Sequence, residues 1–168
     1  MDAFLVIASK RDQRRYADRE IPTEVQRKIL EAGRIAGSAQ NRQPRRFLVI
    51  DDPELRNQIA ETVYAAANVR GAKLVVAIVV TGSPGFDVGR AAQNMMLAAW
   101  NEGVTSCPNG MPDAAVTGGL LGLGEDENVI NILTFGYPDP PRSPEDRPAE
   151  EWLARAKRKS FDEVVERR

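Results

Sequence analysis

The chain has 168 residues, of which 42% are hydrophobic, and a formal net charge of −1. This length suits one compact domain with its own core, and the near-neutral charge argues against a general nucleic-acid binder. The chain has no histidine. That absence excludes Ser-His-Asp and Cys-His catalytic sites and most zinc sites, so we expect no metal, and redox chemistry would need a bound cofactor.

The sequence gives no sign of export or of a membrane span. The apolar run over residues 3–8 is too short for a signal peptide, and no stretch approaches the ~20 apolar residues that cross a bilayer. Cys107 is the single cysteine and has no partner for an internal disulfide. We therefore expect a cytoplasmic protein without membrane partners.

Hydrophobic periodicity predicts helices that alternate with strands along the chain. The expected helices cover residues 2–10, a segment from Thr23 with an apolar stripe reaching Ala36, a segment from Pro53 with a stripe reaching Ala67, and residues 87–102. The expected strands are residues 46–51, 73–81 and 129–135. Only three strands are strong, which favours an α+β layered domain over a doubly wound sheet.

Two of these elements are expected to be deeply buried. The strand over 73–81 is continuous in β-branched residues, which is typical of a central strand covered on both faces. The helix over 87–102 is small or apolar nearly all round, which indicates burial in a core or in a subunit interface.

The composition changes after Gly136. Residues 138–149 hold five of the eleven prolines and are acidic. This pattern predicts an extended surface arm over 138–168, with a helical piece near 150–158, on a single domain spanning 1–168.

Three basic clusters stand out against the neutral net charge. They are Lys10-Arg11 with Arg14-Arg15, then Arg42 with Arg45 and Arg46, then Arg155 with Lys157, Arg158 and Lys159. Guanidinium groups can bind a phosphate, but charge alone favours the simpler interpretation of solvated helix faces. The chain contains neither a G-x-G-x-x-G segment after a strand nor a P-loop, so neither a Rossmann site nor a P-loop site is indicated.

Five segments, in order, resemble the nitroreductase family of FMN enzymes. They are Lys10–Tyr16 (KRDQRRY), Ala36–Phe47 (AGSAQNRQPRRF), Asp87–Gly103 with its Gln93-Asn94 pair, Val129–Pro138 ending in FGYP, and Lys157–Val165 (KRKSFDEVV). The resemblance covers almost the whole chain. It implies a nitroreductase-like fold, with a central mixed sheet flanked by helices, in an intertwined homodimer that binds FMN at its interface.

The resemblance also implies which residues contact FMN. Lys10, Arg11 and Arg14 would hold the phosphate together with Arg158 or Lys159, with Asp12 in the same segment. Ser38 and Asn41 would reach the flavin from the partner subunit. Pro108, Asn109 and Gly110 would lie along the isoalloxazine edge, where backbone N–H groups stabilise the reduced flavin.

The chain departs from the family pattern at three positions. Asp12 stands where the family usually has Ser, and a carboxylate there is expected to pair with Arg11 or Arg14. Gly37 replaces the usual Pro, which loosens the loop, and Arg45 replaces the usual Trp. Arg45 either adds charge near the cofactor or faces solvent.

The implied activity is that of an FMN-dependent oxidoreductase. In a ping-pong scheme, NAD(P)H would reduce the flavin, and a nitroaromatic, quinone or similar electron-poor acceptor would then be reduced on the same face. No catalytic side chain is indicated. Two alternatives stay open: a non-catalytic dimer that binds a flavin or deazaflavin, and a specialised branch that fragments flavin or removes halogen.

Overall fold

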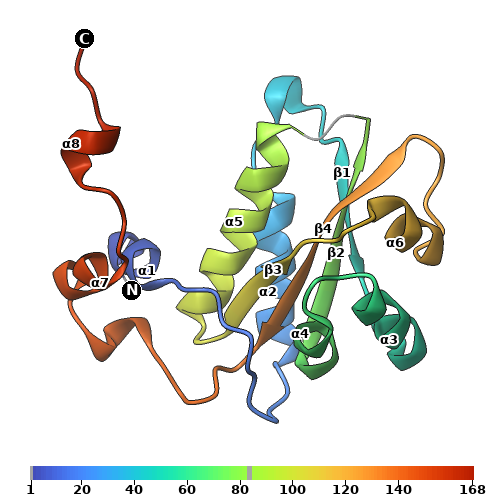
Figure 1. Ribbon diagram of the computed structural model, residues 1–168, viewed down its shortest axis with the longest axis horizontal. Helices are drawn as coiled ribbons and strands as arrows, with labels where there is room; N and C mark the ends of the chain where they lie inside the picture. Colours follow the sequence, from blue (N-terminus) through green and yellow to red (C-terminus); the bar gives the residue numbers. More distant parts are fainter. Residues whose placement is uncertain (1, 83–84) are drawn as a thin grey trace.

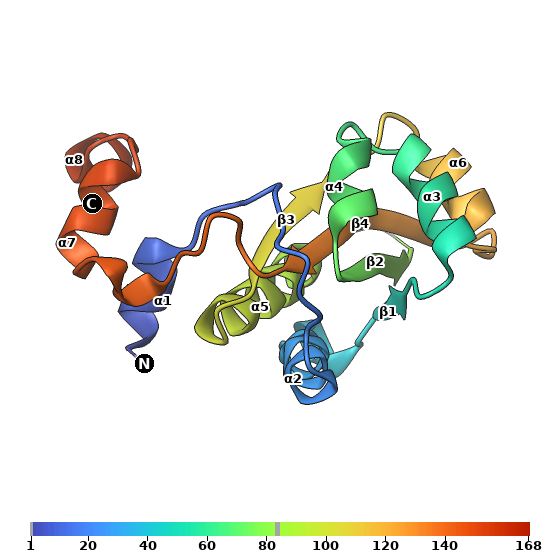
Figure 2. The same ribbon diagram turned by 90° about the horizontal axis from the view of Figure 1, so that it is seen from below.

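The computed structural model describes residues 2–82 and 85–168 of the chain. Its centre is a four-stranded sheet in the order β1-β2-β4-β3. The strands are β1 (Arg45–Val49), β2 (Leu74–Thr81), β3 (Thr105–Asn109) and β4 (Glu127–Gly136). Helices cover both faces of this sheet, which confirms the predicted α+β class (Figures 1 and 2).

Neighbouring strands pair antiparallel, where the sequence predicted a mixed sheet. β2 and β3 run in the same direction, as is common for strands joined through a helix, but β4 lies between them and is antiparallel to both. Among the described residues, parallel pairing is limited to an isolated bridge between Asp12 and Ser106. The sequence predicted β2 and β4 as strands but not β3, the edge strand that pairs with β4.

β2 forms the centre of the core. Its residues Leu74–Val80 are all buried, as the continuous apolar run predicted. One face of the sheet packs against α2 (Thr23–Arg34) and α5 (Phe86–Asn101), and the other against α3 (Pro53–Glu61), α4 (Ala66–Gly71) and α6 (Ala114–Leu120). The sheet is therefore a rigid support for the loops and edges around it.

The helix predicted from Pro53 to Ala67 is divided into α3 and α4. Its start is as expected, because the Asp52 carboxylate accepts from the backbone N–H groups of Glu54 and Leu55, at 3.1 and 3.3 Å. The Thr62 hydroxyl then donates to the Ile59 carbonyl at 2.8 Å, and the backbone N–H of Tyr64 donates to the Gly110 carbonyl at 3.1 Å. The chain leaves the helix here to contact the end of β3.

The C-terminal segment returns to the N-terminus. The backbone N–H of Ala17 donates to the Tyr137 carbonyl at 2.8 Å, so the chain after β4 runs beside the segment that follows α1 (Ala3–Ser9). It continues through a 3₁₀ turn, η2 (Pro144–Asp146), to α7 (Ala149–Arg155), which packs against α1, and α8 (Phe161–Val164) extends away from the body (Figure 1).

Trp152 anchors α7, because its ring is buried and its Nε1–H donates to the Pro144 carbonyl at 2.9 Å.

Within residues 2–82 and 85–168, no helix is both long and apolar enough to cross a membrane.

Candidate functional site

A cleft of about 540 Å³ lies where α1, α5, α7 and β3 meet. It brings together five of the residues that the sequence suggested: Lys10, Arg11, Asp12, Pro108 and Arg158. We call this cavity the interior cleft. Its walls come from both ends of the chain and from its middle, so the two terminal basic clusters contribute to one site.

The interior cleft is apolar along its sides. Phe4 and Ile7 of α1 line it although they are 54% and 55% exposed, together with Met96 and Leu153. Apolar side chains next to cationic groups suit a ligand that has a flat apolar part and an anionic tail. The sequence singled out none of these four residues. The large apolar residues of the short helix over 2–10 were a signal for Phe4 and Ile7, and the apolar helix over 87–102 was a signal for Met96.

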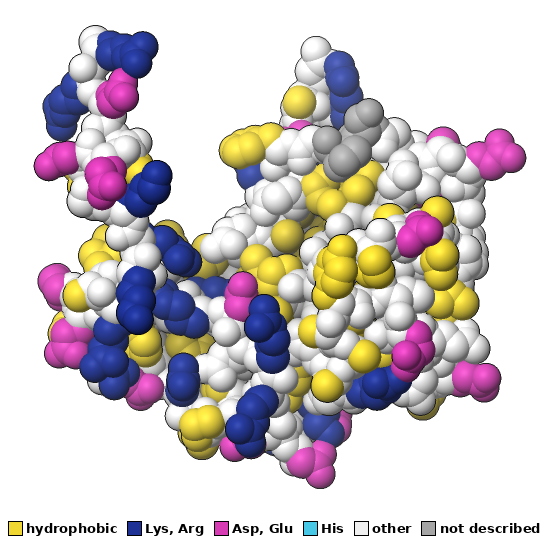
Figure 3. Space-filling model, viewed as in Figure 1, with side chains coloured by type: hydrophobic (Ala, Val, Ile, Leu, Met, Phe, Trp, Pro, Cys, Tyr) yellow, Lys and Arg dark blue, Asp and Glu magenta, His cyan; other side chains and the backbone are white. Residues whose placement is uncertain are grey.

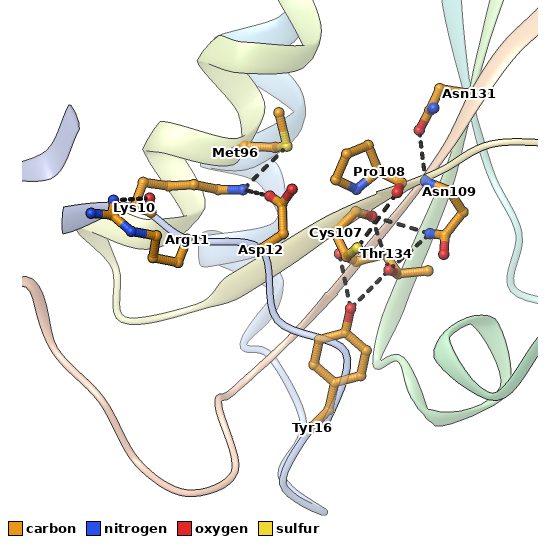
Figure 4. Close-up of polar contacts among 10 residues, drawn as sticks. All are labelled: Lys10, Arg11, Asp12, Tyr16, Met96, Cys107, Pro108, Asn109, Asn131 and Thr134. Carbon is orange, nitrogen blue, oxygen red and sulfur yellow. Dashed lines mark hydrogen bonds and ion pairs between the residues drawn. The ribbon is translucent and has the colours of Figure 1, made fainter. Parts of the chain in front are cut away.

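Lys10 and Asp12 form an ion pair at this cleft (Figure 4). The Lys10 side chain is only 8% exposed, and its ammonium group also lies 3.5 Å from the sulfur of Met96. The Asp12 side chain is half exposed. Pairing of Asp12 with Arg11 or Arg14 was therefore a wrong expectation, because Asp12 pairs with the buried lysine two residues earlier.

Arg11 is held by backbone carbonyl groups. Its Nη1 donates to the carbonyls of Ala8 and Lys10 at 2.8 and 2.7 Å, and its Nη2 donates to the carbonyl of Trp152 at 2.7 Å. These bonds join the end of α1 to α7. Arg11 thus lines the cleft where it was expected, but it also has a structural role that the sequence did not indicate.

Asn109 belongs to a buried polar network (Figure 4). Its Nδ2 donates to the Ile132 carbonyl at 2.8 Å, and its backbone N–H donates to Oδ1 of Asn131 at 3.0 Å. Its Oδ1 accepts from Nδ2 of Asn68 at 2.7 Å. The side chain therefore points into the protein and fixes β3 against β4, rather than lining the cleft beside Pro108.

Tyr16 closes the same network. Its hydroxyl lies 2.8 Å from Oγ1 of Thr134, which donates to the Cys107 carbonyl at 3.0 Å. Burial raises the pKa of the Tyr16 phenol well above its ordinary value. The tyrosine therefore stays neutral and acts as a structural hydrogen-bonding group. Cys107 itself is buried and directly precedes Pro108 on β3.

Gly110 lies exposed at the end of β3. A side chain at this position would contact the ring of Tyr64 at 3.4 Å, and Tyr64 is 77% exposed.

β3 itself was not predicted, because Cys107-Pro108-Asn109 has the composition of a loop. Proline is tolerated there because β3 is an edge strand, which can accommodate a residue without a backbone N–H.

Ser38 and Asn41 lie far from the interior cleft. Their loop is fixed to the start of α5, since the backbone N–H of Ala39 donates to Asp87 at 2.7 Å. Lys10 contacts Met96 of the same helix, nine residues after Asp87, which corresponds to about 14 Å along the helix axis. Neither Ser38 nor Asn41 is among the residues that line the cleft. Arg14 and Lys159 are exposed and also lie outside the cleft lining.

The other two departures from the family pattern have local explanations. A Cβ at Gly37 would lie 2.8 Å from Nη2 of Arg90, so glycine leaves space for that guanidinium. Arg45 donates to the Ala36 carbonyl, while its Nε and Nη1 are buried and have no hydrogen-bond partner in the described part of the chain. Arg45 thus neither lines the interior cleft nor extends into solvent.

The chain forms an α+β protein with a cleft lined by apolar and cationic side chains, and comparison with known proteins identifies its family. Residues 7–82 and 84–137 match the model of the nitroreductase family. The chain belongs to this family. A protein from Methanothermobacter thermautotrophicus, provisionally named an NADH dehydrogenase/NAD(P)H nitroreductase, is 31% identical over 149 residues, which cover 82% of this chain and 78% of that protein.

Solved structures agree with this assignment. A nitroreductase family protein from Clostridium difficile 630 superposes with a TM-score of 0.81, with 26% identity over 99% of this chain and 98% of that one. A provisionally named nitroreductase from Desulfovibrio desulfuricans, solved in complex with FMN, gives a TM-score of 0.78, with 31% identity over 96% of this chain and 98% of that one.

The residues of the interior cleft fit an FMN molecule. Lys10, Arg11 and Arg158 supply cationic donors for a phosphate, and Met96 and Leu153 supply apolar contacts for a ring system. The volume lies within the range of about 300–1,000 Å³ that is usual for small-molecule sites. Asp12 is the unfavourable element, because its charge repels a phosphate and already engages Lys10.

Proposed function

We propose that this protein is an FMN-dependent oxidoreductase that takes electrons from NAD(P)H and passes them to nitroaromatic, quinone or similar electron-poor acceptors. The observation that carries the proposal is the interior cleft, which places the cations Lys10 and Arg158 beside apolar walls and Pro108. The related structure from Desulfovibrio desulfuricans that contains FMN, and a Clostridium difficile R20291 protein described as an FMN-dependent nitroreductase, support it.

In this proposal, bound FMN supplies the hydride and electron transfer, and the chain positions and tunes it. Lys10 and Arg158 hold the phosphate, and Arg11 joins α1 to α7, the helices after which these two residues lie. Pro108 packs along the ring, and the exposed backbone of Gly110 provides the N–H donor at its edge. The network around Asn109 makes this edge rigid, because it ties β3 to β4 by several hydrogen bonds.

We also propose that the working form is a homodimer. The outer side of α5 is exposed at Arg90, Gln93 and Asn94, and Phe86 at its start is 83% exposed. A second copy packed on this face, with its arm wrapped round the first, would cover these side chains. In this arrangement Ser38 and Asn41 of one chain would reach the flavin of the other, since neither residue lines the interior cleft of its own chain.

The test is spectroscopic. The purified protein, or the protein reconstituted with FMN, should show flavin absorbance that NAD(P)H bleaches under anaerobic conditions and that a quinone restores. Light scattering should give the mass of two chains. A protein that cannot be reconstituted with FMN would exclude the proposal. Bound flavin that NAD(P)H does not bleach would instead favour a non-catalytic flavin-binding role.

A further inference from the structure

A second cavity is lined by four arginines. It has a volume of about 430 Å³ and lies between the N-terminal segment and the C-terminal arm. We call it the arginine pocket; its lining contains Arg11, Arg142, Arg147 and Arg155, the carboxylate of Asp146, and the ring of Trp152. Figure 3 shows Lys and Arg side chains gathered on this side of the molecule, over α1 and α7.

Two carboxylates near the arginine pocket offset part of this charge. Asp146 lines the pocket, and one of its oxygens also accepts from the backbone N–H of Ser143 at 2.9 Å. Glu151 lies 3.7 Å from Nε of Arg147, which is a loose ion pair. The positive charge of the pocket therefore exceeds the negative charge beside it.

The remaining arginines have neutral partners or none. Arg11 donates to three backbone carbonyl groups. Nη1 of Arg142 lies 3.1 Å from the side-chain oxygen of Gln13, with the Gln13 amide oriented to accept. Arg155 makes no ion pair with any other described residue. Clustered guanidinium groups whose partners are uncharged repel one another, and an anion in their midst relieves that repulsion.

Trp152 gives the arginine pocket a rigid base. The guanidinium carbons of Arg11 and Arg147 lie 5.8 and 5.2 Å from the centre of its ring. The ring itself is buried and hydrogen-bonded to Pro144. Arginines that are already positioned lose less entropy when they bind a ligand.

We propose that the arginine pocket is an anion site for a small organic phosphate, separate from the flavin. A phosphate monoester carries about −1.5 to −2 charge at pH 7, and arginine binds it through paired hydrogen bonds. The volume favours an organic phosphate over the inorganic ion, because it falls in the range of about 300–1,000 Å³ that small-molecule sites occupy.

The arginine pocket and the interior cleft can be tested separately. They share Arg11, but Arg142, Arg147 and Arg155 line only the first, and Lys10 and Arg158 line only the second. The inference therefore does not depend on flavin chemistry. It requires only that Arg142 and Arg155, which are both exposed, can be changed without loss of the fold.

The experiment is calorimetric titration of the full chain, saturated with FMN where it binds, at low and then at physiological salt. The probes are AMP, inorganic phosphate and, as an uncharged control, adenosine. We expect AMP to bind more tightly than inorganic phosphate, adenosine not to bind, and added salt to weaken AMP binding. Absence of AMP binding at low salt would overturn the proposal. Equal affinity for AMP and inorganic phosphate would overturn the choice of an organic ligand.

Variants of the lining arginines show which of the two cavities binds AMP. The double change Arg142→Gln and Arg155→Gln should weaken AMP binding by about tenfold or more and leave FMN binding unchanged. Arg27→Gln, an exposed arginine on α2, is the matched control and should change neither. Arg158→Gln should weaken FMN binding alone. If Arg158→Gln abolishes AMP binding and the double variant retains it, AMP occupies the interior cleft and the proposal is wrong.

Discussion

The buried ammonium group of Lys10 is paired with Asp12, two residues further along the chain, at the edge of the interior cleft. The lysine is therefore partly neutralised before any ligand arrives. A phosphate that binds here must compete with the Asp12 carboxylate for Lys10 and must also approach a like charge.

Replacing Asp12 by the serine that is usual in the family should therefore tighten FMN binding. We expect the dissociation constant of Asp12→Ser to fall by roughly tenfold, or about 1.4 kcal/mol. Quenching of flavin fluorescence on titration measures it. Asp162→Ser, an exposed carboxylate on α8, serves as the control. Unchanged or weaker FMN binding by Asp12→Ser would show that the Lys10–Asp12 pair does not oppose the phosphate.

Removing the Lys10 charge should have the opposite effect. Lys10→Gln is expected to weaken FMN binding by about tenfold or more, because it removes a charged donor and leaves Asp12 unopposed in the cleft. Arg15→Gln is a matched control, since the Arg15 side chain is 81% exposed and outside the cleft. Equal losses in both variants would indicate a general effect of net charge rather than a phosphate contact.

Arg11 should matter more for stability than its neighbours do. Arg11→Ala removes three hydrogen bonds to carbonyl groups, including the one to Trp152 that joins α1 to α7. We expect a loss of about 2–3 kcal/mol in the free energy of unfolding, measured by urea denaturation. Limited proteolysis should cut the C-terminal arm faster in this variant. An arm as resistant as that of the unchanged protein would contradict the structural role.

Gly136 is required by the position of Tyr16. A Cβ at Gly136 would lie 2.7 Å from the Tyr16 ring, close to where that ring joins its own backbone, so the ring cannot simply swing away. Gly136→Ala should therefore lower the free energy of unfolding by about 1–3 kcal/mol. Gly119→Ala is the control, because nothing lies within 4 Å of its added Cβ. Similar stability of the two variants would show that the Tyr16 ring does not pack against Gly136 in solution.

Glu127 at the start of β4 forms an ion pair with Arg46 of β1 across the intervening strand β2, and this ion pair predicts a pH effect. Arg46 donates to both its oxygens, at 2.6 and 2.8 Å, and these bonds lower the pKa of Glu127 to about 2, from 4.5. A lowered carboxyl pKa stabilises the fold above the unfolded value, and this contribution is lost as pH falls from about 4.5 through about 2.

Unfolding temperatures recorded from pH 5 to pH 2 should therefore decline less steeply for Arg46→Gln than for the unchanged protein, and added salt should reduce the difference. Parallel curves for the two proteins would show that the pair contributes nothing to acid sensitivity.

The sequence was sufficient for features set by local pattern. The β-branched run of β2 predicted its burial. The resemblance to the family implied that Lys10, Pro108 and Arg158 share one site, and the three residues line one cleft. β3 was missed because a strand containing Pro108 is allowed only at a sheet edge, and edge position is a property of the whole sheet. The strand propensity of individual residues carries no information about where a strand lies in the sheet.

The roles of Arg11 and Asn109 could not be predicted for a similar reason. Both residue types are equally suited to a ligand contact and to satisfying backbone carbonyl groups. The choice depends on Trp152 for Arg11 and on Asn131 and Ile132 for Asn109, and these partners are remote in sequence. The arginine pocket was missed because Arg142 and Arg147 stand singly in the proline-rich segment, where neither belongs to a basic cluster.

The interior cleft is lined by residues from within 4–12 and 153–158, which are far apart in the sequence, and by Gln93, Met96 and Pro108 from between them. During synthesis on the ribosome, the nascent chain can form the sheet and its covering helices well before α7 has been translated. The cleft is complete only when α7 has docked on α1. Under the proposed function, FMN therefore binds only after most of the chain has been synthesised, and a protein that retains FMN has α7 docked on α1.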